Sequence, residues 1–116
     1  FIFTTALPPI QLEWSFFVIN QMININEERM WLRKSSQKVK EALEEKGFTS
    51  TSSSHILPVV IGDSKETILK AGEMQRKGFY MLPVRPPTVP EGTSRLRISL
   101  TAGITSAELN QLIQNL

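Results

Sequence analysis

The sequence predicts a small α/β domain in which helices cover one face of an antiparallel-rich sheet, preceded by a lone strand and an apolar helix. Segments with helical periodicity alternate with short apolar runs of strand length, which gives the body the order αβαββα. The same helix-stop triplet, Lys-Gly-Phe, follows two of the expected helices. With 116 residues, the chain is long enough for one hydrophobic core.

The N-terminal region does not resemble the start of an independent domain. Residues 1–5 are expected to form a strand that Pro8 and Pro9 stop, and it opens without a cap or turn, as in a piece of a longer protein. Residues 10–26 follow as a helix with large apolar side chains in most directions. Such a helix is normally buried on several sides, so we expect it to pack against a region outside this chain or against a second copy. Its polar residues and length make it unsuitable for crossing a bilayer.

A second helix is expected over residues 27–46, with a narrow apolar stripe. Gly47 suits the left-handed position after a helix end, and Phe48 is the apolar residue that often follows. Residues 49–54 then form a polar loop. The stripe consists of Leu32, Val39, Ala42 and Leu43.

The first strand of the body is expected at residues 55–61, a nearly continuous apolar run. Pro58 interrupts it and marks an edge or the start of the strand, because proline cannot donate to a sheet ladder. Asp63 caps a third helix, and Glu66 stands three residues later, as in a capping box. That helix ends at residues 77–79.

The C-terminal half holds two more strands and a helix. Residues 79–84 are expected to be a short strand, and a proline-rich loop follows it. Residues 95–100 alternate, with leucine and isoleucine on one face and arginine and serine on the other. Thr105 and Glu108 form a second capping box for the last helix. The apolar positions of that helix are Leu109, Leu112, Ile113 and Leu116.

Composition excludes several classes of function. The chain has no cysteine, which excludes a disulfide scaffold, a thiolate metal site and a cysteine nucleophile, and fits a reducing compartment such as the cytoplasm. Thirteen Lys and Arg face eleven Asp and Glu with mixed signs along the chain, so we expect neither nucleic acid nor membrane as a partner. His55 is the only histidine, and without a partner ligand it is expected to be a strand-entry residue and not part of a metal site.

Two groups of residues suggest ligand binding. Arg97 lies on the polar face of the last strand, beside a rigid loop that carries Arg85, and a guanidinium there suits a bidentate contact with a carboxylate. The alternative is an ordinary exposed strand arginine. The hydroxyls of Thr4 and Thr5 could bind a phosphate together with a neighbouring helix N-terminus. Their alternative is a simple β-strand preference of threonine.

Three blocks of sequence then identify a family. Residues 1–9 (FIFTTALPP), 55–63 (HILPVVIGD) and 84–102 (VRPPTVPEGTSRLRISLTA) together resemble the C-terminal third of the α-oxoamine synthases. The blocks occur in the family's order, and the resemblance spans nearly the whole chain. The Arg-Pro-Pro opening of the third block favours the biotin-pathway branch over the 5-aminolevulinate, 2-amino-3-ketobutyrate and sphingoid-base branches.

The resemblance implies a homodimeric, pyridoxal-phosphate-dependent enzyme of aspartate aminotransferase fold type I. Such enzymes condense an amino acid with an acyl-CoA and release CO2; for the biotin branch the substrates are L-alanine and pimeloyl-CoA or pimeloyl-carrier protein. By resemblance, Arg97 holds the amino-acid carboxylate and Arg85 is a loop arginine near that carboxylate. Thr4, and with less support Thr5, reach across the dimer to the partner's cofactor phosphate.

The resemblance also implies what this chain lacks. The family's Schiff-base lysine lies upstream, and Lys65 cannot replace it because it begins a surface helix, so this chain alone is expected to be inactive and to bind the cofactor weakly. Ile104 stands where family members often have histidine. Residues 1–26 would end the large domain, and residues 27–116 would form the small domain. A different α-oxoamine synthase and a free-standing, non-catalytic binding module remain the alternatives.

Overall fold

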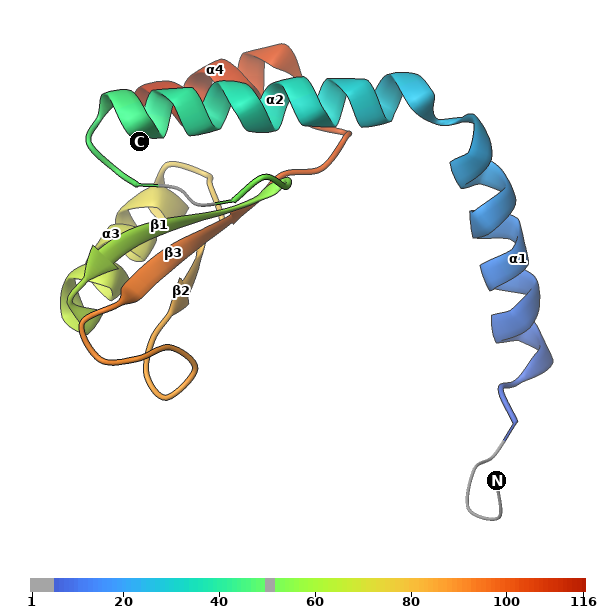
Figure 1. The fold of residues 1–116 in the computed structure, drawn as a ribbon, viewed down its shortest axis with the longest axis horizontal. Helices are drawn as coiled ribbons and strands as arrows, with labels where there is room; N and C mark the ends of the chain where they lie inside the picture. The colour runs from blue at the N-terminus through green and yellow to red at the C-terminus, as the bar shows by residue number, and fades with distance from the viewer. Residues whose placement is uncertain (1–5, 50–51) are drawn as a thin grey trace.

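The computed structural model describes residues 6–49 and 52–116 and confirms the predicted αβαββα body (Figure 1). The strand expected at residues 1–5 lies outside the described residues. The most N-terminal helix precedes the body, and most boundaries differ from the expected ones by one or two residues. The elements are α1 (Pro9–Asn24), α2 (Asn26–Glu45), β1 (Ile56–Gly62), α3 (Ser64–Arg76), β2 (Leu82–Val84), β3 (Ser94–Ser99) and α4 (Ser106–Asn115).

The sheet has the strand order β1-β3-β2, and both pairings are antiparallel. Proline explains which strands lie at the edges. Pro58 in β1 and Pro83 in β2 cannot donate a ladder hydrogen bond, so each strand can pair on one side only. β3 (SRLRIS) contains no proline, so its backbone can form hydrogen bonds on both sides, and it takes the central position.

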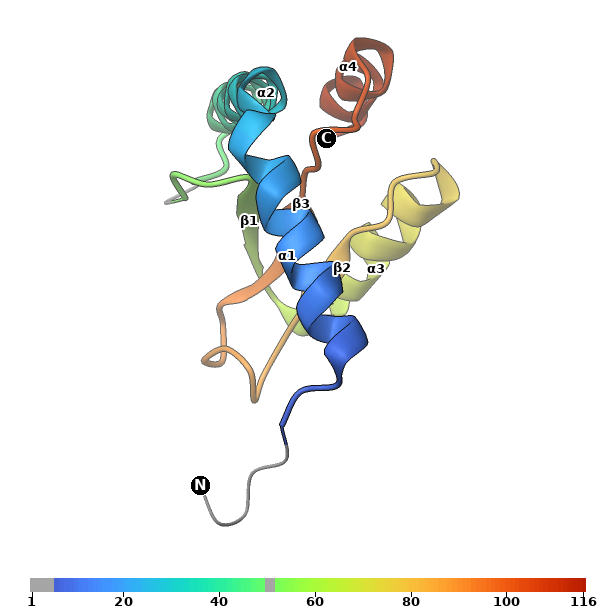
Figure 2. The ribbon, with the colours of Figure 1, turned by 90° about the vertical axis from the view of Figure 1, so that its right-hand side faces the viewer.

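The core lies on one face of this sheet, which α2, α3 and α4 cover (Figures 1 and 2). Leu57 pairs with Ile98 and Val59 pairs with Leu96, and all four side chains are buried against the helices. Each such side chain contributes about 1.5–3 kcal/mol when it is fully buried. The buried apolar residues that complete the core are Val39, Ala42, Leu43, Ala71, Met74, Met81, Leu100, Leu109 and Leu112.

The helix ends follow the predicted signals with two corrections. Asp63 caps α3 by accepting hydrogen bonds from the backbone nitrogens of Lys65 and Glu66, at 2.8 and 2.9 Å. The reciprocal bond, in which the Glu66 carboxylate would accept from the Asp63 nitrogen, is absent from the described hydrogen bonds, so only half of that capping box forms. The strand expected at residues 79–84 begins only at Leu82, because the backbone nitrogen of Phe79 closes the end of α3 on the Met74 carbonyl at 2.9 Å.

The end of α2 and the start of α4 match the predictions in full. Gly47 has φ +83°, and the Phe48 nitrogen donates to the Leu43 carbonyl at 2.9 Å, which completes the predicted helix stop. At α4, Thr105 Oγ1 accepts from the Glu108 nitrogen at 3.2 Å, and Glu108 Oε2 accepts from the Thr105 nitrogen at 2.8 Å. That reciprocal pair is the capping box.

Helix α1 extends away from the body (Figure 1) and buries none of its residues. Its aromatic side chains are largely exposed, with Trp14 at 65% and Phe16 at 67%. Its large apolar side chains are therefore mostly exposed, and the predicted packing against another surface stays a prediction. Within the described part of the chain, no helix is both long and apolar enough to cross a membrane.

Candidate carboxylate-binding face

Arg97 lies on the central strand, on the face of the sheet that the helices leave uncovered. Its neighbours across the ladder are Pro58 on β1 and Leu82 on β2. Side chains alternate along a strand, so Arg97 points away from the core because Leu96 and Ile98 point into it. The alternation predicted from the sequence is therefore confirmed, and it leaves the Arg97 side chain exposed.

The residues around Arg97 on this uncovered face are mainly apolar. Ile56 and Val60 on β1 are 41% and 42% exposed, and Leu82 on β2 is 37% exposed. A cation framed by apolar side chains becomes a strong anion site once another surface covers it, because a lower local dielectric strengthens a charge-assisted hydrogen bond. We call this surface the open face: Ile56, Pro58, Val60, Leu82, Val84, Arg95, Arg97 and Ser99.

The two arginines of β3 differ in the hydrogen bonds that their side chains make. Arg95 Nε donates to the Thr93 carbonyl at 3.0 Å, which ties that guanidinium back to its own strand. Arg97 makes no side-chain hydrogen bond or ion pair within residues 6–49 and 52–116. Its five N–H donors are therefore available to a planar, bidentate acceptor such as a carboxylate.

Arg85 is the first residue after β2 and begins a turn-rich loop. The Thr88 nitrogen donates to the Arg85 carbonyl at 3.0 Å, and Thr93 Oγ1 donates to the Pro90 carbonyl at 2.7 Å, so local hydrogen bonds shape both ends of the loop. Leu82 is opposite Arg97, and Arg85 is three residues further, about 10 Å along the strand direction. The two arginines therefore belong to adjacent elements, with their backbone positions offset along the strand direction.

The other predicted site residues are placed as follows. Thr4 and Thr5 lie outside the described residues. His55 is exposed, and its carbonyl accepts from the Leu100 nitrogen at 3.0 Å, which fits the predicted strand-entry role. Among the described residues no group of three or more His, Cys, Asp or Glu could hold a metal ion.

The open face presents no lysine among the described residues. The lysines lie on α2 and α3 or at the residue that ends each helix. Lys65, excluded as a Schiff-base lysine from the sequence, is exposed in the first turn of α3. Among the described residues the open face therefore offers guanidinium donors but no amine to a carbonyl compound.

The two carboxyls with shifted pKa values serve the helix caps and not the open face. Backbone N–H donors of Glu66 and Lys65, together with the Lys65 charge, lower the pKa of Asp63. Hydrogen bonds from the backbone and hydroxyl of Thr105 lower the pKa of Glu108. Both carboxylates stabilise helix N-termini, which is a structural role.

Sequence reasoning missed two features near these elements. Trp31 Nε1 donates to the Ile104 carbonyl at 2.9 Å and thereby joins α2 to the loop before α4. This bond gives the backbone at Ile104 a structural function. The second feature is a groove between α2 and residues 52–55, whose only sequence signal is the absence of acidic residues from Arg29 to Lys40.

Known proteins resemble this chain over its full length. The family model for aminotransferase class I and II matches residues 1–116. The 8-amino-7-oxononanoate synthase of Haemophilus ducreyi is 44% identical over 97% of this chain and 29% of that protein. The synthase of the same name from Chlorobaculum parvum is 40% identical over 96% of the chain and 28% of that protein. The chain thus spans less than a third of the length of these relatives.

Solved structures show the same fold. Serine palmitoyltransferase from Sphingomonas wittichii matches with a TM-score of 0.88 and 25% identity, over 97% of this chain and 29% of that one. An 8-amino-7-oxononanoate synthase from Francisella tularensis matches with a TM-score of 0.81 and 23% identity, over 97% of this chain and 33% of that one. The relatives are pyridoxal-phosphate-dependent enzymes, and this chain corresponds to their C-terminal part. The chain therefore belongs to the aminotransferase class I and II family.

Proposed function

We propose that the chain is the C-terminal part of an α-oxoamine synthase of the 8-amino-7-oxononanoate synthase type. The whole enzyme would condense L-alanine with pimeloyl-CoA or pimeloyl-carrier protein, release CO2 and thereby serve biotin synthesis in the cytoplasm. Two relatives of that name, at 44% and 40% identity, support this branch. The observation that carries the proposal is the guanidinium of Arg97, which has no partner among the described residues and lies on the central strand of the open face.

Arg97 would bind the carboxylate of the amino-acid substrate. Its position between Pro58 and Leu82 places its guanidinium between apolar side chains of the two edge strands. A guanidinium forms two parallel hydrogen bonds to a carboxylate, which fixes the orientation of the substrate as well as its charge. Arg85, on the loop after β2, would lie near the same substrate. Both roles depend on the upstream part of the enzyme covering the open face.

The cofactor would be held mainly outside this chain. Pyridoxal phosphate supplies an electron sink for a carbanion at the amino-acid Cα. The described residues do not fit the cofactor by themselves, because the open face has no lysine. The hydroxyls of Thr4 and Thr5 would contact the cofactor phosphate of the partner subunit in a homodimer. We therefore expect this chain alone to be inactive and to bind the cofactor weakly.

The domain division follows from the same proposal. Residues 1–26 would end the large domain, and residues 27–116 would form the small domain. The largely exposed apolar side chains of α1 and the apolar frame of the open face support this division, since both need a covering surface. A free-standing binding module would leave both surfaces in water, which disfavours that alternative.

A substrate panel tests the proposed reaction. The full-length protein, loaded with pyridoxal phosphate, would be assayed for CoA release with L-alanine, glycine or L-serine against pimeloyl-, acetyl-, succinyl- or palmitoyl-CoA. We expect the highest kcat/KM for L-alanine with pimeloyl-CoA. A preference for L-serine with palmitoyl-CoA would instead support the branch to which the serine palmitoyltransferase neighbours belong. No release with any pair would refute the family-based reaction for this protein.

An immunoblot of a source extract tests whether the chain works within a longer protein. An antibody against this chain should detect a band far above 13.1 kDa. A band at 13.1 kDa would favour the binding-module alternative, because such a protein would lack the lysine on which the reaction depends.

A further inference from the structure

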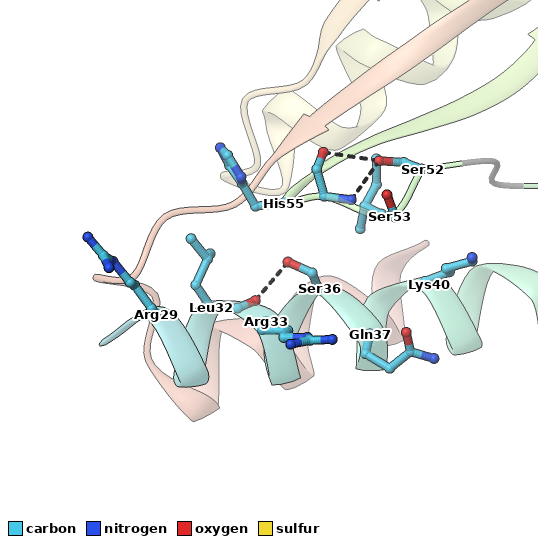
Figure 3. A pocket seen from close by; sticks show the side chains of 11 residues that line it. Arg29, Leu32, Arg33, Ser36, Gln37, Lys40, Ser52, Ser53 and His55 are labelled. Atoms are coloured by element: carbon cyan, nitrogen blue, oxygen red, sulfur yellow. Dashed lines mark hydrogen bonds between the residues drawn. The ribbon is translucent and has the colours of Figure 1, made fainter. Parts of the chain in front are cut away.

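The groove between α2 and residues 52–55 has the features of an anion site. It has a volume of about 440 Å³, and α2 forms one wall while the serine-rich segment before β1 forms the other (Figure 3). The α2 residues that line it are Arg29, Leu32, Arg33, Ser36, Gln37 and Lys40, and the opposite wall holds Ser52, Ser53, Ser54, His55 and Leu57.

The residues that line the groove include three cations and no acidic side chain. Arg29, Arg33 and Lys40 contribute three fixed positive charges, and none of the lining residues is Asp or Glu. From Arg29 to Lys40 the helix carries five Lys or Arg residues and no acidic residue. An ordinary solvated helix face alternates acids and bases at i,i+4, which neutralises it. In this groove Lys40 alone has an ion-pair partner among the described residues, Glu44 at 3.9 Å.

The opposite wall adds hydroxyl donors. Ser52 and Ser54 are linked by an Oγ–Oγ hydrogen bond of 3.1 Å, and the Ser54 nitrogen also donates to Ser52 Oγ at 3.1 Å, which orders this segment. Figure 3 shows Ser36 on α2 facing these serines, with its hydroxyl donating to the Leu32 carbonyl at 2.7 Å. Guanidinium groups and hydroxyls are the donors that phosphate oxygens accept from.

The groove and Arg97 lie on opposite faces of the sheet. Leu57 lines the groove and pairs with Ile98 on the core face, whereas the next residue, Pro58, pairs with Arg97 on the open face. Arg29 is held at the groove's edge by a hydrogen bond of 2.6 Å from its Nη2 to the Met22 carbonyl at the end of α1. A ligand here would therefore contact α2, the serine segment and, through Arg29, the junction with α1.

We propose that this groove binds the phosphate monoester of a small molecule. The dianion would receive charge-assisted hydrogen bonds from Arg33 and Lys40 and hydroxyl hydrogen bonds from the serine segment. The volume exceeds the need of a bare phosphate and lies within the range of sites for drug-sized ligands. Such a phosphate monoester is present both in free phosphorylated metabolites and, as the 3′-phosphate, in CoA. Only binding of CoA rests on the proposed function.

Calorimetric titration of the full-length protein, loaded with pyridoxal phosphate, tests the site with two matched variants. Arg33→Gln removes a charge from the groove, and Lys34→Gln removes the same charge from the adjacent residue, which does not line it. With inorganic phosphate as the probe, we expect saturable binding that Arg33→Gln weakens by at least about tenfold, or about 1.4 kcal/mol, and that Lys34→Gln barely changes. Both residues are exposed, so circular dichroism should show both variants folded.

The outcomes separate the possibilities. No saturable phosphate binding, or an equal loss in both variants, would overturn the proposal, because equal loss indicates only diffuse electrostatic attraction. A second titration compares CoA with dephospho-CoA, which lacks the 3′-phosphate. Tighter binding of CoA that depends on Arg33 supports the site and assigns it to CoA. Phosphate binding with no difference between the two CoA forms supports the site and assigns it to a free phosphorylated metabolite.

Discussion

Two adjacent residues of β3 should respond very differently to the same substitution. Ile98 is 4% exposed and packs in the core against the helices, whereas Arg97 lies on the open face. Ile98→Ala removes three buried carbons at about 0.8 kcal/mol each, and the remaining cavity raises the cost to about 3–4 kcal/mol. Arg97→Ala removes an exposed side chain without a described partner and should change the free energy of unfolding by no more than about 0.5 kcal/mol.

The assay is urea-induced unfolding followed by circular dichroism, with thermal unfolding as a second probe. At about 4–8 °C per kcal/mol, Ile98→Ala should lower Tm by more than 10 °C, whereas Arg97→Ala should leave it nearly unchanged. The m-value should stay constant in both variants, so that the midpoint alone reports stability. Equal destabilisation by the two substitutions would refute the assignment of Arg97 and Ile98 to opposite faces.

Three further predictions concern the helix ends. Thr105→Ala should destabilise the protein by about 1 kcal/mol in urea unfolding, since it removes half of the capping box; a neutral effect would contradict the cap. Gly78→Ala should destabilise by about 1–2 kcal/mol, because Gly78 has φ +89°; a more stable variant by the same measurement would argue against this backbone conformation. The lowered pKa of Asp63 means that its stabilisation is present above the unfolded-state value near 3.8 and is lost as pH falls through the folded-state pKa. Asp63→Asn keeps a capping side chain but removes the group that titrates. The stability advantage of the wild type over this variant should therefore shrink below about pH 4. A difference in unfolding free energy that does not change with pH would exclude this link between the pKa of Asp63 and stability.

Local chemistry made much of the fold predictable. Two glycines with Phe after them mark helix ends, and Thr105 with Glu108 marks a helix start, because these signals act within a few residues. The alternation along β3 predicted which face would hold Arg97. Pro58 predicted either an edge strand or the start of a strand, and the structure shows the edge, because a residue without an N–H cannot pair on both sides.

Features made by distant contacts were not predictable. Trp31 finds its acceptor at Ile104, which is 73 residues away in sequence, and no local pattern announces such a partner. The apolar frame around Arg97 depends on the register that places Leu82 and Pro58 opposite it. The basic groove likewise needs α2 to pack beside the serine segment. Hydrophobic periodicity predicts which face of a helix or strand is buried, but it does not predict which other element packs against that face.

The open face and α1 support the same view of the chain. A single strand arginine is a weak indication of function, and exposed apolar side chains are common on proteins. Here Arg97 has no hydrogen-bond or ion-pair partner among the described residues, and its face of the sheet is uncovered. Helix α1 buries none of its residues. These three observations together fit a domain whose ligand site is completed by other parts of a larger enzyme.

Steady-state kinetics of Arg97→Lys in the full-length enzyme tests the central claim most directly. Lysine keeps the charge but cannot form the bidentate contact, and losing a charge-assisted contact in a covered site costs about 2–5 kcal/mol. We predict that kcat/KM for the amino acid falls by about 30-fold or more, while KM for the acyl donor changes little. Arg95→Lys, on the same face but tied to Thr93, is the matched control and should have a much smaller effect. Unchanged amino-acid kinetics in Arg97→Lys would contradict the assignment of Arg97 as the carboxylate-binding residue.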